Sequence, residues 1–126
     1  MDPYAGVSSE ATTSALMRLA LDGAALRHQA LASNIANAKL PGYVPLRVPF
    51  EAALGRARER LAAHEDASAV LADAAPALSE DPSAAAASVD MQVAELAQNV
   101  LQYQALLKGW SKRVAILSTA IHEGKR

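Results

Sequence analysis

Apolar side chains in the last third of the chain recur at alternating intervals of four and three residues. The series runs through Val89, Val93, Leu96, Val100, Tyr103, Leu107, Trp110, Val114, Leu117 and Ile121. A period of about 3.5 residues, sustained over more than about four heptads, is typical of a coiled-coil seam rather than the wider apolar face of a surface helix. We therefore predict one long helix within residues 88–126, with Ser88 as its N-cap and Asp90 in its first turn.

A second long helix is predicted near the start of the chain, from about Ser9 to Asn37. Ser8 or Ser9 is the expected N-cap, and Glu10 falls in the first turn. The apolar positions recur at spacings of three and four, through Leu16, Leu19, Gly23, Leu26 and Ala30, with Leu31 and Ile35 widening the face. The glycine costs about 1 kcal/mol relative to alanine in a helix interior. It indicates either close approach of another backbone or a local weakness.

The segment between these helices, residues 41–87, has no sustained period. Pro41, Pro45 and Pro49 exclude a central strand and favour extended or edge structure. Residues 50–64 are compatible with a short helix, whereas the alanine-rich residues 67–87 are interpreted as a flexible or weakly ordered connection. We predict an all-α fold: an N-terminal helix within residues 1–40, a variable central loop region at 41–87, and a C-terminal helix within 88–126. The two long helices are expected to pair as an antiparallel coiled coil.

Composition and charge narrow the class of protein. Of the 126 residues 52% are hydrophobic, but much of this is alanine and only 4% are aromatic, which suits closely spaced helices better than a thick core. Two long helices in so short a chain are marginal alone, so partners are expected. With a net charge of −1, the chain has no excess of positive charge of the kind that binds nucleic acid, and no nucleic-acid partner is expected. With no cysteine, disulfides and thiolate chemistry are excluded.

Neither a cleaved secretory signal nor a membrane span is expected. Residues 1–4 lack the basic and apolar regions of a cleaved signal peptide. No apolar run approaches the roughly 20 residues that span a bilayer, so direct membrane insertion is not expected.

Catalytic chemistry is not indicated. His28, His64 and His122 are far apart and none has a second ligand at helical spacing, so we interpret them as surface residues and expect no metal or cofactor. Tyr103 and Trp110 lie on the heptad series, which makes packing their first explanation, within the chain or between chains. We therefore expect a protein that is not an enzyme.

The junction after the first helix carries the most specific motif. Leu40 precedes a proline and is biased toward an extended conformation. Pro41 and Gly42 suit the two central positions of a type II turn, and Tyr43 is placed to fold back as an amphipathic anchor.

Asn34-Ile35-Ala36-Asn37-Ala38, followed by Pro41-Gly42-Tyr43, resembles the N-terminal signature of the bacterial flagellar axial proteins, which form the rod, hook and hook-associated parts. That family usually has Asn or Asp and then Thr before Pro-Gly-Tyr, where this chain has Lys39 and Leu40. Residues 89–99 and 101–106 resemble the C-terminal helix of the proximal rod proteins of FlgB type. The resemblance covers about the first 50 and the last 40 residues and omits the middle.

The resemblance implies a structural subunit of the proximal rod of the flagellar basal body, which assembles helically with other rod proteins into the drive shaft and export channel wall. It further implies type III export without a cleaved signal, a periplasmic location, and contacts with copies of itself, other rod proteins, the ring-to-rod adaptor and the export apparatus. Assembly is then expected to rest on Leu16, Leu19, Leu26, Val93, Leu96, Val100, Tyr103, Leu107, Trp110, Val114, Leu117 and Ile121. A cytoplasmic helical-hairpin adaptor or export chaperone is the alternative.

Overall fold

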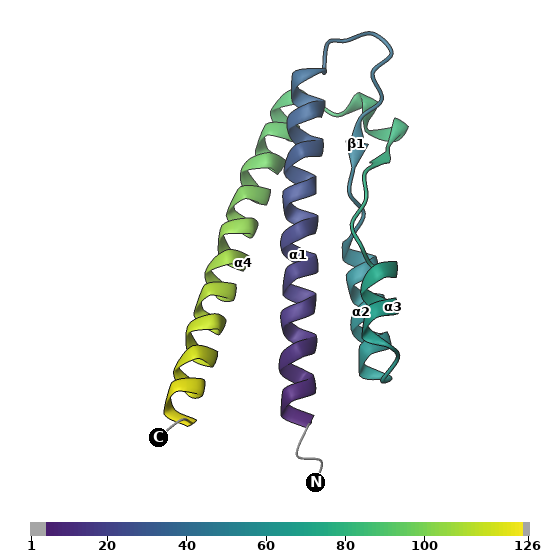
Figure 1. Cartoon of the computed structure of the whole chain (residues 1–126). Coiled ribbons are helices and arrows are strands. Elements are labelled where there is room, and N and C mark those ends of the chain that lie inside the picture. Colours follow the sequence, from purple (N-terminus) through teal and green to yellow (C-terminus); the bar gives the residue numbers. More distant parts are fainter. Residues whose placement is uncertain (1–4, 125–126) are drawn as a thin grey trace.

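The computed structural model describes residues 5–124 and is dominated by two long helices. Helix α1 (Ala5–Ala36) and helix α4 (Val89–Gly124) run side by side in opposite directions (Figure 1). Between them the chain forms β1 (Leu46–Arg47), α2 (Glu51–Ala62), α3 (Ala67–Asp73), β2 (Ser79–Glu80) and the 3₁₀ helix η1 (Pro82–Ala86). The prediction of a mostly helical fold, with a long N-terminal helix packed on a long C-terminal helix, is confirmed.

The sequence predicted the start of α4 correctly but not the start of α1. The hydroxyl of Ser88 accepts a hydrogen bond from the backbone N–H of Met91 at 3.1 Å, which confirms Ser88 as the cap of α4. Helix α1 already begins at Ala5, so Ser8 and Ser9 lie inside it and the predicted N-cap is wrong. Glu10 consequently lies beyond the first turn, and its carboxylate pairs instead with Arg113 of α4.

The central segment is ordered, contrary to the expectation for residues 67–87. Helix α3 is capped by Asp66, whose carboxylate accepts a hydrogen bond from the N–H of Ala69 at 3.1 Å. Strands β1 and β2 pair antiparallel, with Leu46 opposite Glu80 and Arg47 opposite Ser79. The segment is ordered because it packs on an apolar surface of α1. Short alanine-rich helices are only marginally stable without such tertiary contacts.

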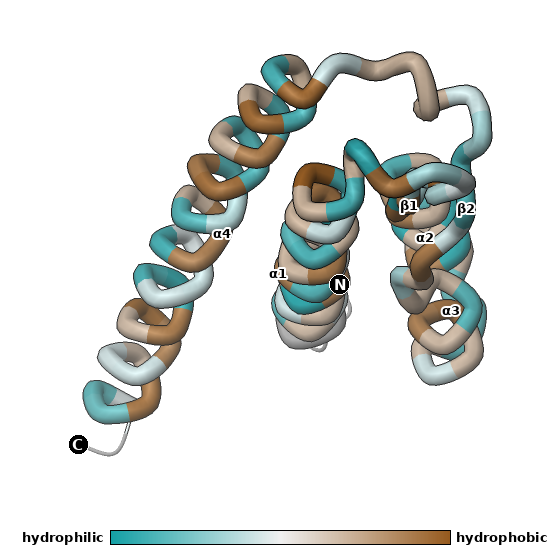
Figure 2. The backbone as a smooth tube through the Cα atoms, turned by 90° about the horizontal axis from the view of Figure 1, so that it is seen from above, coloured by the Kyte–Doolittle hydropathy of each residue, from teal (hydrophilic) through white to brown (hydrophobic). Residues whose placement is uncertain are grey.

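Helix α1 lies between two layers, with α4 on one side and the central segment on the other (Figure 2). Two apolar clusters join α1 to the central segment. The first contains Ala30, Val48 and Phe50 with Leu26 and Leu46 packed against it; the second contains Ala57, Val70 and Ala74 with Leu16, Leu19 and Leu61. The predicted α1 stripe therefore faces the central segment, not α4, because the chain between the helices folds back and covers it.

The contacts between α1 and α4 are antiparallel: residues later in α1 contact residues earlier in α4. Glu10 pairs with Arg113, and a Cβ built at Gly109 would lie 3.5 Å from Cε of Met17. Farther along, the side-chain amide of Asn99 donates to the backbone oxygen of Ala24 at 2.8 Å. The α1 residues in these contacts are seven apart in sequence, which places them on one face of the helix.

Candidate functional site

Asn34 connects the end of α1 to strand β1. Its side chain is 5% exposed. The amide nitrogen donates to the backbone oxygen of Leu46 at 2.9 Å, and the amide oxygen accepts from the backbone N–H of Leu46 at 2.8 Å. The side chain thus takes the place of a neighbouring strand, and β1 is hydrogen-bonded on one edge by β2 and on the other by Asn34.

The Pro-Gly turn has the features that the sequence predicted. The N–H of Tyr43 donates to the carbonyl of Leu40 at 3.2 Å, and Gly42 has a φ of +80°, as the second central position of a type II turn requires. The hydroxyl of Tyr43 folds back, donates to Oδ1 of Asn34 at 2.9 Å and lies 3.0 Å from Oγ of Ser33. The anchor role of Tyr43 is therefore confirmed.

The other motif residues close the helix. The amide nitrogen of Asn37 donates to the carbonyl of Ser33 at 2.8 Å, one turn earlier. Ile35 is half-buried and Ala36, the last residue of α1, is exposed. The motif is thus a connected unit of hydrogen bonds that sets the direction in which the chain leaves α1.

Arg27 holds the start of α2 against α1. Its guanidinium lies 4.4 Å from the centre of the Phe50 ring and donates to the backbone oxygen of Val48 at 2.7 Å. It also pairs with both carboxylate oxygens of Glu51, at 2.7 Å for Oε2. The hydrogen bond from Arg27 lowers the pKa of Glu51 below its usual value, against the opposing effect of partial burial.

Gly23 allows this part of the chain to approach α1 closely. A Cβ placed on Gly23 would lie 2.7 Å from the ring of Phe50, closer than real Cβ contacts allow. Of the two explanations considered from sequence, close approach is correct, but the approaching group is an aromatic ring rather than another backbone.

Helix α4 carries two adjacent stripes at seven-residue spacing. Its less exposed positions are Gln92, Leu96, Asn99, Val100, Tyr103, Leu106, Trp110 and Arg113, which we call the inner stripe. The remaining large residues of the predicted seam are exposed: Val89, Val93, Leu107, Val114, Leu117 and Ile121. Only some residues of the predicted seam therefore face α1, and the others are exposed.

Polar contacts decide which face of α4 is turned toward α1, and this face differs from the predicted apolar seam. Asn99 bonds Ala24 of α1, and Arg113 reaches the carboxylate of Glu10 and, at 3.3 Å, its backbone oxygen. Oε1 of Gln92, Oδ1 of Asn99 and Nε of Arg113 are nevertheless buried without a hydrogen-bond partner. The sequence analysis missed the polar members of this stripe because it considered only apolar positions, although Gln92, Asn99 and Arg113 fall on one seven-residue repeat.

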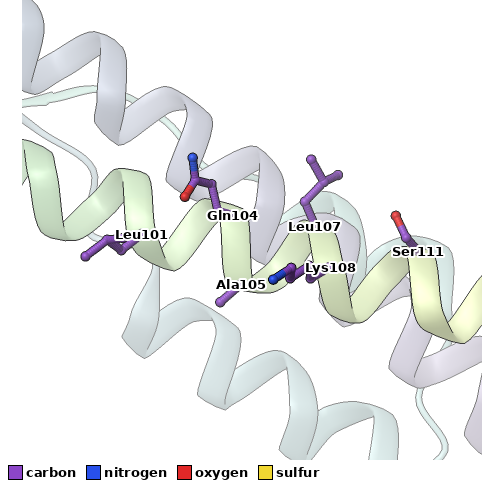
Figure 3. A pocket seen from close by; sticks show the side chains of 6 residues that line it. All are labelled: Leu101, Gln104, Ala105, Leu107, Lys108 and Ser111. Carbon is purple, nitrogen blue, oxygen red and sulfur yellow. The ribbon is translucent and has the colours of Figure 1, made fainter.

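Two hollows border α4. One is a groove of about 530 Å³ between the long helices, lined by Ala24, Ala25, His28, Gln29, Asn99, Val100, Tyr103, Gln104 and Leu107. The other, of about 590 Å³, lies on α4 alone and is lined by Leu101, Gln104, Ala105, Leu107, Lys108 and Ser111 (Figure 3). Leu107 and Gln104 border both hollows, so the two form one continuous surface.

Among residues 5–124 no cluster of three or more His, Cys, Asp or Glu side chains is placed to hold a metal ion. The three histidines lie on different elements: His28 on α1, His64 after α2, and His122 near the end of α4. Within the described part of the chain, no helix combines the length and apolar character needed to cross a membrane.

Comparison with known proteins finds no matching family model, no matching curated protein and no matching solved structure.

Proposed function

We propose that this protein is a structural subunit of the proximal rod of the bacterial flagellar basal body, of FlgB type. The proposal rests on the sequence resemblance at both ends of the chain and on one structural observation that supports it. That observation is the apolar side of α4, which no part of residues 5–124 covers.

The uncovered side is extensive. Val93, Val114 and Ile121 are 48%, 48% and 60% exposed, along a helix of 36 residues, or about 54 Å. Contiguous apolar surface of this extent is typical of protein–protein contact sites. We propose that copies of this chain and related subunits bury it, and that α1 and α4 form an antiparallel coiled-coil core in the assembled rod. Contacts between different faces of successive subunits do not close and give a helical filament.

The junction at the end of α1 supports the same proposal. Pro41, Gly42 and Tyr43 match the family signature, and Tyr43 and Asn34 hold the departing chain to α1. In an assembly, this fixed exit direction keeps the central segment on the far side of α1, leaving the outer side of α4 free for neighbouring subunits.

The proposal includes the location and partners that the resemblance implies. The subunit is exported by the flagellar type III apparatus without a cleaved signal and occupies the periplasmic rod. It contacts other rod proteins, the ring-to-rod adaptor and the export apparatus. It binds no nucleic acid and requires no cofactor.

The test is a charge placed on α4, either on its uncovered side at Leu107 or at Val100, which lines the groove next to α1. Leu107→Asp or Val100→Asp is expected to abolish rod assembly and motility while expression stays normal, because a buried unpaired carboxylate is strongly unfavourable at an interface. Gln98→Asp, at an exposed position of the same helix, is the matched control and should swim normally. Normal motility of the Leu107→Asp strain would refute the assembly role of this surface.

A cytoplasmic adaptor or export chaperone is the second candidate, since an uncovered apolar helix face also suits the binding of a client protein. Cell fractionation separates the two functions. A rod subunit co-purifies with basal bodies, whereas an adaptor stays in the soluble fraction.

A further inference from the structure

We propose that α4 can pack on α1 in two rotational settings, and that Asn99 is the positioning residue that selects the observed one. In the second setting, α4 is turned about its own axis until its exposed apolar residues face α1. This inference concerns a single chain and stands independently of the flagellar proposal.

Four pairs of consecutive residues on α4 define the two settings. In each pair the first residue belongs to the inner stripe and the second is apolar. The pairs are Gln92 and Val93, Asn99 and Val100, Leu106 and Leu107, and Arg113 and Val114. Because successive residues of a helix lie roughly 100° apart, a turn of about half that angle brings the second members toward α1 and moves the first members away. Leu96, Tyr103 and Trp110 lie between the two sets and face α1 in both settings.

The observed setting has two costs that the turn would relieve. Within residues 5–124, Oε1 of Gln92, Oδ1 of Asn99 and Nε of Arg113 are buried without a hydrogen-bond partner. Leu107 and Val114, in contrast, are 43% and 48% exposed. Buried polar atoms without partners and exposed apolar side chains are both unfavourable. The second setting therefore competes with the first.

The surface of α1 under α4 does not by itself fix the rotation. Ala24 is fully buried but offers only a methyl group, and Met17, which lies against α4, is unbranched and adaptable. Two polar contacts fix it instead: the amide of Asn99 donates to the backbone oxygen of Ala24 at 2.8 Å, and Arg113 pairs with Glu10. The Asn99 bond is the buried one, so its loss outweighs that of the partly exposed ion pair.

Asn99 thereby keeps Leu107 and its apolar neighbours outward. A single buried asparagine can fix how two helices pair, at a cost in stability. Here the cost is the partnerless oxygen of the same side chain. The result is that the chain does not cover its own apolar residues, which stay available to another chain.

Asn99→Asp tests the inference. A carboxylate at residue 99 cannot donate to the oxygen of Ala24 and is unfavourable when buried, but it lies toward solvent after the turn. The readout is the rate at which iodoacetamide alkylates a single cysteine in the purified full chain, since the natural chain has none. Leu107→Cys and Leu106→Cys are introduced separately, each with and without Asn99→Asp.

Asn99→Asp is expected to slow alkylation at residue 107 by about tenfold and to speed it at residue 106 to a similar degree. Asn99→Ala, which removes the hydrogen bond without adding a charge, should change both rates in the same directions by smaller factors. Gln98→Asp adds the same charge at the neighbouring, exposed position and is the matched control, which should leave both rates unchanged.

Opposite changes at two adjacent residues distinguish a rotation from unfolding, which speeds alkylation at both. Circular dichroism verifies that the helices of each variant still form. Any result in Asn99→Asp other than opposite changes at residues 106 and 107 would overturn the second setting. That outcome would leave the rod proposal intact, since rod assembly is judged separately by co-purification with basal bodies.

Discussion

At the scale of single residues, Asn34 shows how one side chain fixes the path of the chain. Its amide satisfies both backbone groups of Leu46 and accepts a hydrogen bond from Tyr43. An asparagine is suited to this position because its amide offers a donor and an acceptor, as a peptide group does. A leucine or alanine would leave buried polar groups without partners.

Asn34→Ala is expected to expose the amide of Leu46 to exchange, because it removes the acceptor of that N–H and leaves the site short of about 1–3 kcal/mol of stabilisation. Native-state hydrogen exchange should show protection at Leu46 reduced by roughly tenfold or more. Asn37→Ala, whose amide bonds only within its own helical turn, is the control. Unchanged protection in Asn34→Ala would mean that the side chain is not needed to hold β1.

Gly23 and Gly55 form a natural comparison, since both lie inside helices. Gly23→Ala is expected to destabilise the protein by about 1–3 kcal/mol, because the new methyl group overlaps the Phe50 ring and outweighs the gain in helix propensity. Gly55→Ala has open space around its Cβ and should stabilise α2 by about 0.5–1 kcal/mol. Urea unfolding followed by circular dichroism measures both. Equal stabilisation by the two substitutions would contradict the close approach of Phe50.

At the scale of elements, α1 organises the molecule because both of its long sides are used. One side packs on α2, α3 and β1 through leucines, and the other packs on α4 through smaller and polar residues. The Arg27 contacts with Phe50 and Glu51 attach the start of α2 to the first of these sides. Partial exposure limits the ion pair to the range of surface pairs, about 0.2–1 kcal/mol.

The Arg27–Glu51 pair is expected to give a pH-dependent contribution to stability. Because Arg27 lowers the pKa of Glu51 in the folded state below the usual 4.5, the contribution is complete above that value and is lost as the pH falls through the lower, folded-state pKa. Glu51→Gln should therefore lower the melting temperature at pH 7 and have little effect near pH 3. Glu59→Gln on α2 controls for the change in net charge. A deficit that persists undiminished at the lower pH would exclude the ion pair as its cause.

At the scale of the whole molecule, the long helices extend beyond the surface that can support them. Residues 114–124 of α4 are all exposed. Helices without tertiary contacts are marginal in water even when rich in alanine. The association with other subunits that we propose would give this part of α4 a packing partner.

Dilution is therefore expected to reduce the helix content of the free protein. Circular dichroism at 222 nm should show helicity that rises with protein concentration, with the ends of the long helices largely unfolded in the dilute monomer. Hydrogen exchange can locate the loss, which should be greatest after residue 114. A stable helical fold that melts cooperatively and independently of concentration would argue against folding coupled to assembly.

Local patterns in the sequence determined much of the architecture. The two long helices, the cap at Ser88, the Pro41-Gly42 turn and the anchor role of Tyr43 all follow from spacing, capping and backbone preference, which act over a few residues. The start of α1 was placed too late, because two serines that resemble caps lie inside the helix. The uncovered surface on α4 was predicted only in part, as members of a longer apolar series.

Only the tertiary structure shows which element packs against each apolar stripe of α1 and α4. The sequence marks Leu16, Leu19 and Leu26 as apolar, but only the folding back of α2 and α3 shows that these residues do not face α4. Likewise, the hydrogen bond from Asn99 to Ala24 and the pairing of Arg113 with Glu10 set the rotation of α4. Periodicity identifies that a helix has an apolar side, whereas the choice among neighbours depends on contacts between residues up to 103 apart in sequence.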